Sequence, residues 1–595
     1  MRMANIAQLL TEHIDIWTAA DSEKKSRRGR FNGNAGSVYG VKKLRELILD
    51  LAVRGKLVPQ DVNDEPASEL LKLIQAEKSK LVTEGKLKKE KSLVPIGKGG
   101  KTFQLPNGWE YASFGDVVEI VRGITFPGSE KTKSPENGRV ACLRTTNVQD
   151  QIEWEDILYI REQFISRDDQ ILMPNDIVMS MANSRELVGK VALVGNEIKQ
   201  RTSFGGFLGV IRPYYILPKF VVTLLRTPHT REELIDSASQ TTNIANISLA
   251  KLRPLFFAIP PLAEQLRIVA KVDELMSLCD KLEQQHVNAQ EAHEALVSQL
   301  LATLTQSKNA AEFNANWQRI YAHFDMLFTT EASIDTLKQT LLQLAVMGKL
   351  VAQDSNDEPA RELLIRIQAE KAKLIADGKL KKEKPLAPIS ENEKPFELSK
   401  GWEWVRLFTI SELITSGSRD WAQYLSLSGA KFVTMSNLSR GSYELRTDTM
   451  RFVNPPQNGE GSRTKLQTDD LLVSITGDVG NLGRIPENFG EAYINQHTAM
   501  IRFLPTCRGR FIPEALRAPF ASKQFNEPQR GIKNSFRLTD LELLLLPLPP
   551  IAEQNRIIAK VDALMVLCDQ VKTRIQHANQ QQIAIADTLV AQAVT

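Results

Sequence analysis

The chain carries two copies of one framework, and this internal repeat constrains its fold more than any other feature. The segment LRELILDLAVRGKLVPQDVNDEPASELL, from Leu44, returns from Leu337 as LKQTLLQLAVMGKLVAQDSNDEPARELL, with about two thirds of the positions identical. A second pair, PPLAEQLRIVAKVDELM from Pro260 and PPIAEQNRIIAKVDALM from Pro549, closes each half. The sequence therefore predicts two structural modules of one architecture.

Between these frames lie two inserts that barely resemble each other. Kept frames with diverged inserts indicate two modules that do related but different jobs. The predicted segments are residues 1–43 (N-terminal helix and basic loop), 44–104 (first framework helices), 105–259 (first insert), 260–308 (closing long helix), 309–397 (second framework helices), 398–548 (second insert) and 549–595 (C-terminal long helix).

The frames have the periodicity of helices. Apolar residues recur at steps of three and four, which places them on one helix face that needs a partner. Because the closing helix of the first half is followed at once by the second framework, we expect these to form an antiparallel pair, and we expect the terminal helix to pair with residues 44–85. The residues predicted to pack within the helical frame or to contact a partner are Leu266, Val269, Met276, Ile558, Val561 and Met565.

The inserts switch to short runs rich in β-branched residues, such as KVALVG and DLLVSITG, separated by Gly, Asn, Asp and Pro. They are typical of mixed α/β modules. The predicted fold class is α+β, with two such modules separated by long antiparallel, coiled-coil-like helices and a pseudo-twofold internal repeat.

Composition excludes some classes of protein and leaves others open. No stretch of about 18 uncharged apolar residues is present, and the N-terminus lacks the apolar core of a signal peptide, so we expect a cytoplasmic protein with no membrane partner. The four cysteines form no C-x-x-C pair, which argues against zinc and disulfides and favours buried packing. A net charge of +4 neither requires nor excludes nucleic acid.

Polar loop sequences in both inserts suggest contacts with DNA bases, which Arg, Asn, Gln, Ser and Thr side chains recognise in the major groove. For any single residue, ordinary turn chemistry is the more common explanation, so these residues carry weight only as sets. The candidates are Arg144, Thr145, Asn147, Asn183, Arg185, Thr242, Asn243 and Asn246 in the first insert, and Arg419, Asn437, Thr476, Asn481, Arg530, Lys533 and Asn534 in the second.

Catalytic signatures fail on inspection. VNPPQN, which contains Asn454, resembles the Asn-Pro-Pro motif of DNA amino-methyltransferases, but Gln457 stands where an aromatic residue should stack on the flipped base. GKGGKT lacks the leading glycine of a phosphate loop. No H-E-x-x-H pair and no nucleophile–base constellation is present, so we predict no catalytic residue and no metal site.

At the level of motifs, the chain resembles the specificity subunits of type I restriction-modification systems (HsdS). The resemblance rests on the doubled P-P-x-x-E-Q-x-R-I helices, the LAVRGKLV and LAVMGKLV segments, and the Gly-Trp pairs at Gly108 and Gly401 that open the inserts. It covers nearly the whole chain, and the doubled helix motif is quite specific. The resemblance implies that each insert is a target recognition domain that reads one half of a split DNA site.

The same resemblance implies partners and a division of labour. Double-stranded DNA would be the ligand, two methyltransferase (modification) subunits would dock on the helices, and restriction/translocase subunits would complete the complex. S-adenosylmethionine, ATP and Mg²⁺ would be used by those partners, and this chain would bind no cofactor. Two alternatives stay open: a single-chain DNA adenine methyltransferase, disfavoured by the missing cofactor loop, and a sequence-specific DNA-binding regulator or structural scaffold.

Overall fold

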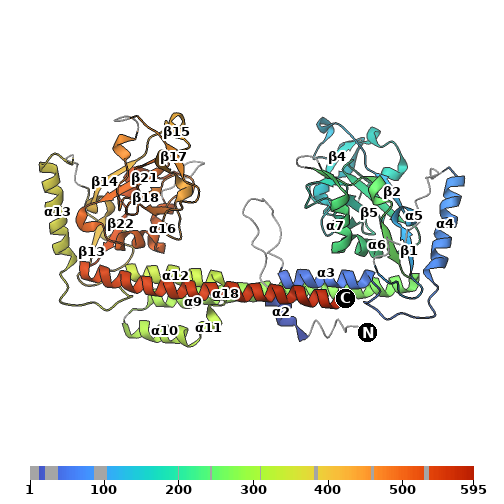
Figure 1. The fold of residues 1–595 in the computed structure, drawn as a ribbon, viewed down its shortest axis with the longest axis horizontal. Coiled ribbons are helices and arrows are strands. Elements are labelled where there is room, and N and C mark those ends of the chain that lie inside the picture. The colour runs from blue at the N-terminus through green and yellow to red at the C-terminus, as the bar shows by residue number, and fades with distance from the viewer. Residues whose placement is uncertain are drawn as a thin grey trace. The chain divides into compact units, whose positions relative to one another are not determined.

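The computed structural model describes residues 12–19, 38–85, 103–198, 200–240, 244–308, 310–380, 386–456, 461–527 and 535–594. The chain divides into two compact units: unit 1 comprises Met1–Ala289 with Asn579–Thr595, and unit 2 comprises Gln290–Ala578 (Figure 1). Each unit combines a helical frame with a module of helices and short strands. The chain is therefore an α+β protein, as the sequence predicts.

Two long helices are shared between the units. α9 (Leu262–Gln306) begins in unit 1 and its residues 290–306 belong to unit 2, whereas α18 (Ile551–Val594) begins in unit 2 and its residues 579–594 belong to unit 1. The frame helices of unit 1 also include α2 (Ile14–Ala19), α3 (Tyr39–Val53) and α4 (Ala67–Thr83); those of unit 2 include α10 (Ala310–Ala322), α11 (Phe324–Leu327), α12 (Glu331–Val346) and α13 (Ala360–Ala376).

In unit 1, the start of α9 runs antiparallel to α3. Arg45 Nη2 on α3 donates to Asp280 Oδ1 and to Glu283 Oε2 on α9, both at 2.7 Å, while residues after α3 meet the beginning of α9. The end of α18 completes this frame: Ala586 is fully buried in its core, and Tyr39 Oη donates to Asp587 Oδ1 at 2.8 Å. The predicted packing of the terminal helix against the first framework therefore holds for its last part, residues 579–594, and not for the rest of the helix.

In unit 2, the predicted direction of one helix pair is wrong. His293 Nε2 on α9 lies 3.0 Å from the carbonyl oxygen of Leu327, and Lys349 Nζ donates to Thr305 O at 2.7 Å, so α9 and α12 run the same way. The reason is α10, an intervening helix that carries the chain back before α12 starts. The antiparallel partner of α12 is α18, where Lys572 Nζ donates to Asp335 Oδ1 at 2.8 Å.

The repeated glycines end the first framework helix of each unit. Gly55 and Gly348 both have a φ of +67°, a left-handed conformation that favours glycine and terminates a helix. A Cβ on Gly55 would approach Pro106 Cγ to 2.6 Å, and a Cβ on Gly348 would approach Ser399 Oγ to 2.4 Å. The glycine of the LAVxGKLV repeat is therefore required both by the backbone conformation and by the close contact with the start of each module.

Module 1 (residues 105–259) contains two packed sheets. A four-stranded antiparallel sheet has the order β2-β9-β5-β7, and a three-stranded sheet has the order β4-β3-β8, in which β3 and β8 are parallel. Val121, Leu143, Val178, Phe204 and Val210 form the core that both sheets share. The bounds are β1 (Glu110–Ser113), α5 (Phe114–Val117), β2 (Val118–Arg122), β3 (Arg139–Leu143), β4 (Leu158–Arg161), β5 (Ile177–Ser180), β6 (Ala182–Asn183), β7 (Val191–Leu193), β8 (Thr202–Phe204), β9 (Leu208–Pro213), α6 (Pro218–Arg226), α7 (Pro228–Ser237), β10 (Ser239–Gln240), β11 (Ala245–Asn246), α8 (Leu249–Leu252) and β12 (Phe256–Ile259).

Module 2 (residues 398–548) repeats the order of these strands and adds one edge strand, β15, to the second sheet. Its sheets have the orders β14-β21-β18-β19 and β15-β17-β16-β20, and β16 and β20 are parallel like β3 and β8. In each module a strand at the beginning pairs with one at the end, β1 with β12 and β13 with β22. The bounds are β13 (Glu403–Arg406), α14 (Leu407–Ile410), β14 (Ser411–Ser416), β15 (Leu425–Ser426), β16 (Ala430–Val433), β17 (Arg451–Val453), β18 (Leu471–Ser474), β19 (Leu482–Arg484), β20 (Ala492–Ile494), β21 (Thr498–Phe503), α15 (Phe511–Arg517), α16 (Pro519–Asn526), α17 (Leu538–Glu542) and β22 (Leu545–Leu548).

The four cysteines are free and buried, which confirms their predicted role in packing: Cys142, Cys279, Cys507 and Cys568. Burial raises the pKa of the Cys142 and Cys507 thiols to about 12 and that of Cys279 to about 11. Their thiolate forms are therefore scarce at neutral pH, and these sulfurs are poor nucleophiles.

Candidate nucleic-acid interface

The repeated E-Q-x-R motif lies where module 1 meets its frame. Trp109 opens the module, and its indole Nε1 donates to Glu264 Oε2 on α9 at 2.9 Å; both side chains are buried. One turn further along α9, Arg267 forms a two-pronged ion pair with Asp64, at 3.2 and 2.6 Å. Burial raises the pKa of Glu264, although the indole hydrogen bond and Arg267 both act to lower it. These residues fasten the module to the helical frame.

Unit 2 repeats the fastening atom for atom. Trp402 Nε1 donates to Glu553 Oε2 at 2.9 Å, and Arg556 pairs with Asp357 at 3.1 and 2.5 Å. Burial again raises the pKa of the glutamate, Glu553. The most specific motif of the sequence is therefore a structural clamp, and its duplication means that both modules are held in the same way.

At one end of module 1, several loops converge through backbone hydrogen bonds. Gly205 N donates to Leu143 O at 3.0 Å, and Phe207 O accepts from Met181 N at 2.8 Å. A Cβ on Gly123 would come within 2.1 Å of Gly205 O, so this close approach needs glycine. We call the assembled loops loop edge 1, which consists of residues 123–125, 144–147, 181–185, 205–207 and 244–246.

Module 2 assembles an equivalent edge. Ile475 N donates to His497 O at 3.0 Å, in the place of the Met181–Phe207 bond, and Gly417 would clash with Ile494 O at 2.0 Å if it carried a Cβ. Phe536 N closes the set with a bond to Ile475 O at 2.9 Å. Loop edge 2 consists of residues 417–419, 434–437, 475–478, 495–497 and 535–536.

Three of the predicted DNA-contacting residues have a different role. Asn147 is 2% exposed; its Oδ1 accepts from Arg144 N at 2.9 Å and its Nδ2 donates to two carbonyl oxygens, those of Glu153 and Glu155. Asn437 is 1% exposed and forms the same bonds to Thr434 N and Arg446 O. Because both side chains are buried and their amides bond to their own loops, they hold these loops in place and are not exposed to a ligand.

Asn481 also bonds within its own loop, although its Oδ1 accepts no hydrogen bond from the described residues. It is buried, and its Nδ2 donates to Asp478 Oδ2 at 3.0 Å while its backbone N donates to Ser474 Oγ at 2.9 Å. These bonds stabilise the turn after β18. The sequence reasoning took Asn for a base-reading residue at all three positions, although Asn is equally common where a loop must be tied together.

The remaining described candidates do lie on the loop edges, with side chains that are exposed or half-buried. In module 1 the structure brings Asn183 and Asn246 together, because β6 pairs with β11, and places Arg185 just beyond them. In module 2, Thr476 Oγ1 lies 2.8 Å from His497 Nδ1, and Arg419 is exposed. The set is completed by Arg144 and Thr145 in loop edge 1. Thr242, Asn243, Arg530, Lys533 and Asn534 lie outside the described residues.

Two of the candidate arginines already have acidic neighbours. Arg144 Nη2 donates to Asp156 Oδ2 at 2.8 Å, and this bond holds the pKa of Asp156 below its usual range. Arg185 Nη2 lies 3.4 Å from Asp236 Oδ1, with both side chains exposed. The residues that sequence reasoning missed are the turns Gly205–Phe207 and Asn495–His497, which sit at the centre of each edge. No motif marks them, because their position depends on strand pairing.

Comparison with known proteins places this architecture in a family. The family model described as the type I restriction modification DNA specificity domain matches residues 106–290. The EcoAI specificity subunit of Escherichia coli, a type I restriction enzyme component, is 38% identical across 99% of this chain and 100% of that relative. The chain belongs to the type I restriction enzyme specificity subunits.

A second specificity subunit is similar over the same length. The EcoEI specificity subunit of Escherichia coli is 37% identical across 98% of this chain and 99% of that relative. Among solved structures, the HsdS subunit of Thermoanaerobacter tengcongensis is 17% identical, with a TM-score of 0.37 over 83% of this chain and 98% of that chain, a likeness too low to support further argument.

The frame helices of this specificity subunit pack much as predicted, with one exception. Val561 is buried, and Val269, Met276, Ile558 and Met565 pack against the cores of their units. Leu266 is 57% exposed, so its predicted packing role is wrong. The buried face of this part of α9 is centred on Ile268, and Leu266 lies outside that face.

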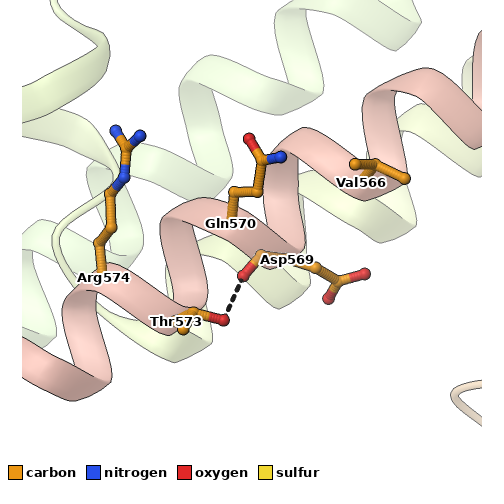
Figure 2. Close-up of a pocket in the computed structure, with 5 residues that line it drawn as sticks. All are labelled: Val566, Asp569, Gln570, Thr573 and Arg574. Carbon is orange, nitrogen blue, oxygen red and sulfur yellow. Dashed lines mark hydrogen bonds between the residues drawn. The ribbon is translucent and has the colours of Figure 1, made fainter.

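A shallow pocket on this specificity subunit lies on one stretch of α18 (Figure 2). It is lined by Val566, Asp569, Gln570, Thr573 and Arg574, and Thr573 Oγ1 donates to Asp569 O at 2.9 Å. Among the residues described, no cluster of three or more His, Cys, Asp or Glu side chains could hold a metal ion. None of the described helices has the length and apolar character needed to cross a membrane.

Proposed function

We propose that this specificity subunit reads a bipartite DNA target, with one half-site contacted by each loop edge. One observation carries the proposal: the two modules share the strand order of their main sheets and the same clamp to the frame, yet the side chains on their loop edges differ. Two readers of different sequences need this combination, because the framework must position each reader identically while the exposed side chains discriminate bases.

The ion pairs of the exposed arginines are compatible with DNA binding. Arg185 pairs with Asp236 at 3.4 Å and Arg440 with Asp478 at 3.2 Å, and all four side chains are more than half exposed. Exposed pairs of this kind contribute at most about 1 kcal/mol, so Arg185 can leave its acid for a phosphate or a guanine at little cost, whereas Arg440 would also give up its bond to Val479 O at 2.6 Å. Asp236 and Asp478 would also disfavour a DNA sequence that offers the arginine no hydrogen-bond acceptor, because the arginine would then gain nothing by leaving its acid.

The long helices would then serve as a spacer. Each module is fastened to its own frame through buried groups, and α9 and α18 each continue into the other unit's frame. We propose that these antiparallel, coiled-coil-like helices set the gap between the half-sites, about one helical turn or roughly 34 Å for sites read from one side of the duplex. Joining two readers makes the second engagement intramolecular and raises affinity for DNA that carries both half-sites.

We further propose that the chain supplies specificity and scaffold without catalysis. Two methyltransferase subunits would dock on the frame, together with restriction/translocase subunits, and S-adenosylmethionine, ATP and Mg²⁺ would be bound by those partners. Exposed leucines at equivalent positions of the two long helices, Leu278 and Leu567, support a repeated docking surface that would take two copies of one partner. Burying such leucines is the expected energetic contribution of a docking interface.

Long-read methylation sequencing of the host genome, with the gene intact and deleted, tests the proposal. We expect methyladenine to disappear from one split motif on deletion. Methylation that persists unchanged would overturn the specificity role. Purified full-length chain that binds S-adenosylmethionine by calorimetry would instead favour a single-chain methyltransferase, and transcript changes without methylation changes would favour a DNA-binding regulator.

A further inference from the structure

The turns at the centre of the loop edges occupy the same structural position in both modules. In unit 1, Phe207 O accepts hydrogen bonds from Met181 N at 2.8 Å and Ala182 N at 3.2 Å, and Leu208 N donates back to Gly205 O at 2.8 Å. In unit 2, His497 O accepts from Ile475 N at 3.0 Å, and Thr498 N donates to Asn495 O at 3.2 Å. Both backbones are therefore held between two strands of the module.

The side chains on these equivalent backbones differ completely. Unit 1 carries Gly205-Gly206-Phe207, whereas unit 2 carries Asn495-Gln496-His497. The flanking residues keep their type, since β8 and β20 before the turns, like β9 and β21 after them, are buried strands. A structurally equivalent position that carries different residues in the two modules is where two readers of unlike half-sites should differ.

Phe207 is the clearest case, because 64% of a large apolar side chain is left in water on a fixed backbone. A second exposed apolar residue, Ile244, lies nearby. It precedes Ala245, which pairs with Asn183 on β6. Asn183 in turn follows Ala182, whose backbone N donates to Phe207 O. Polar base-reading candidates and exposed apolar groups thus meet at one place. In the major groove, the apolar feature of a base edge is the C5-methyl group of thymine.

In unit 2 the turn is polar and its side chains are already ordered. His497 Nδ1 lies 2.8 Å from Thr476 Oγ1, and His497 Nε2 lies 3.1 Å from Gln496 Nε2. If the Gln496 amide donates to Nε2, the ring proton sits on Nδ1 and is donated to Thr476 Oγ1. This chain orients the Gln496 carboxamide, and a carboxamide matches the acceptor and donor that adenine shows at N7 and N6.

We propose that these two turns enter the DNA major groove and each determine one base pair: Phe207 by contact with a thymine methyl group, and Gln496, oriented by His497, by hydrogen bonds to adenine. The inference rests on the proposed function and names specificity-determining residues within it. Phe207 and Gln496 contact the base, and His497 is a positioning residue.

The test uses the full chain expressed in the host with its native partners, and reads the methylated motif by long-read sequencing. Phe207→Ala should relax one position of one half-site, with discrimination at that position falling about 5- to 150-fold, the range typical of a single mismatched base pair. Tyr215→Ala is the matched control. Tyr215 is similarly exposed but follows the opposite end of β9, so the DNA motif methylated with this variant should equal that of the wild type. Gln496→Ala should relax a position in the other half-site.

The outcomes separate this inference from the function beneath it. A wild-type chain that directs no motif at all would overturn the proposed function. If Phe207→Ala leaves the methylated motif unaltered and the methylation rate within about twofold of wild type, the role of Phe207 alone is overturned. The same holds if the motif is unaltered but the partner subunits co-purify more weakly. Relaxation of the same half-site by Phe207→Ala and Gln496→Ala would also contradict the assignment of one turn to each half-site. Thermal unfolding midpoints equal to wild type would show that the variants fold.

Discussion

Replacing Asp176 by Asn should weaken unit 1 severely while leaving unit 2 intact. Arg212 Nε donates to Asp176 Oδ1 at 2.8 Å and Arg212 Nη2 donates to Oδ2 at 2.9 Å, and the two side chains are 13% and 3% exposed. Asparagine has the same shape, but it carries no charge and removes the carboxylate that bonds the buried guanidinium, which leaves only the more distant Glu119 and Asp169 to offset the arginine charge. Breaking a buried pair in this way costs about 3–5 kcal/mol, which is about a 150- to 5,000-fold change in the folding equilibrium.

Hydrogen exchange with mass spectrometry can check this expectation, because peptides from the two units are measured separately. Slowly exchanging amides of β5 and β9 should exchange faster by that factor in Asp176→Asn, whereas those of β18 and β21 should keep wild-type rates. Asp470→Asn is the matched control, since Asp470 forms the same bidentate pair with Arg502, and it should reverse the pattern. Exchange in unit 1 within about twofold of wild type would refute the reasoning, and equal acceleration of both units would refute their independence.

Three further predictions follow from the frame and the core. Deleting residues 579–595 should accelerate hydrogen exchange in α3 of unit 1 more than in α12 of unit 2. The reason is that this segment places Ala586 in the core of unit 1 and accepts the Tyr39 hydrogen bond there; equal acceleration in both helices would contradict the prediction. Burial raises the pKa of Glu264 above its ordinary 4.5, so the folded state binds that proton more tightly, and the free energy of unfolding should fall as pH rises from about 4.5 through the raised folded value. Glu264→Gln should therefore flatten this part of the profile of thermal midpoint against pH. An unchanged slope would argue against this role of Glu264. A disulfide reagent at mildly alkaline pH should label almost none of the four thiols in the folded chain and all four in denaturant, whereas rapid labelling of the native chain would show that a cysteine is accessible.

The large organisation was predictable from the sequence because it is written in repeats and periods. The duplication revealed two modules, and the helical spacing of residues such as Val561 identified a packed face. The face was misplaced at Leu266, since several apolar residues encircle α9 and periodicity alone does not choose among them. The direction of α9 against α12 was also missed, because the intervening α10 follows no repeat in the first half.

The loop edges were only partly predictable, because they form through strand pairing between distant segments. Composition marked Asn183 and Asn246 as candidates, and that they lie side by side follows only from the pairing of β6 with β11. The same composition rule failed at Asn147 and Asn437, whose amides close loops from inside. Phe207 was invisible to a search for polar base readers, and only its exposure on a fixed turn reveals it.

The chain ends complete the frame of the same unit, and this constrains how the protein can be divided. Tyr39, near the start of α3, bonds Asp587, near the end of α18, so the frame of unit 1 is finished only by the last residues of the chain. In unit 2 the corresponding third helix is supplied by residues 290–306 of α9. A cut at the sequence midpoint would therefore leave α3 with an exposed apolar face. Exchange of one module for another should instead be made between the two clamps, at Trp109 and Glu264 or at Trp402 and Glu553, where the tryptophan-glutamate contact with the frame is the same in both units.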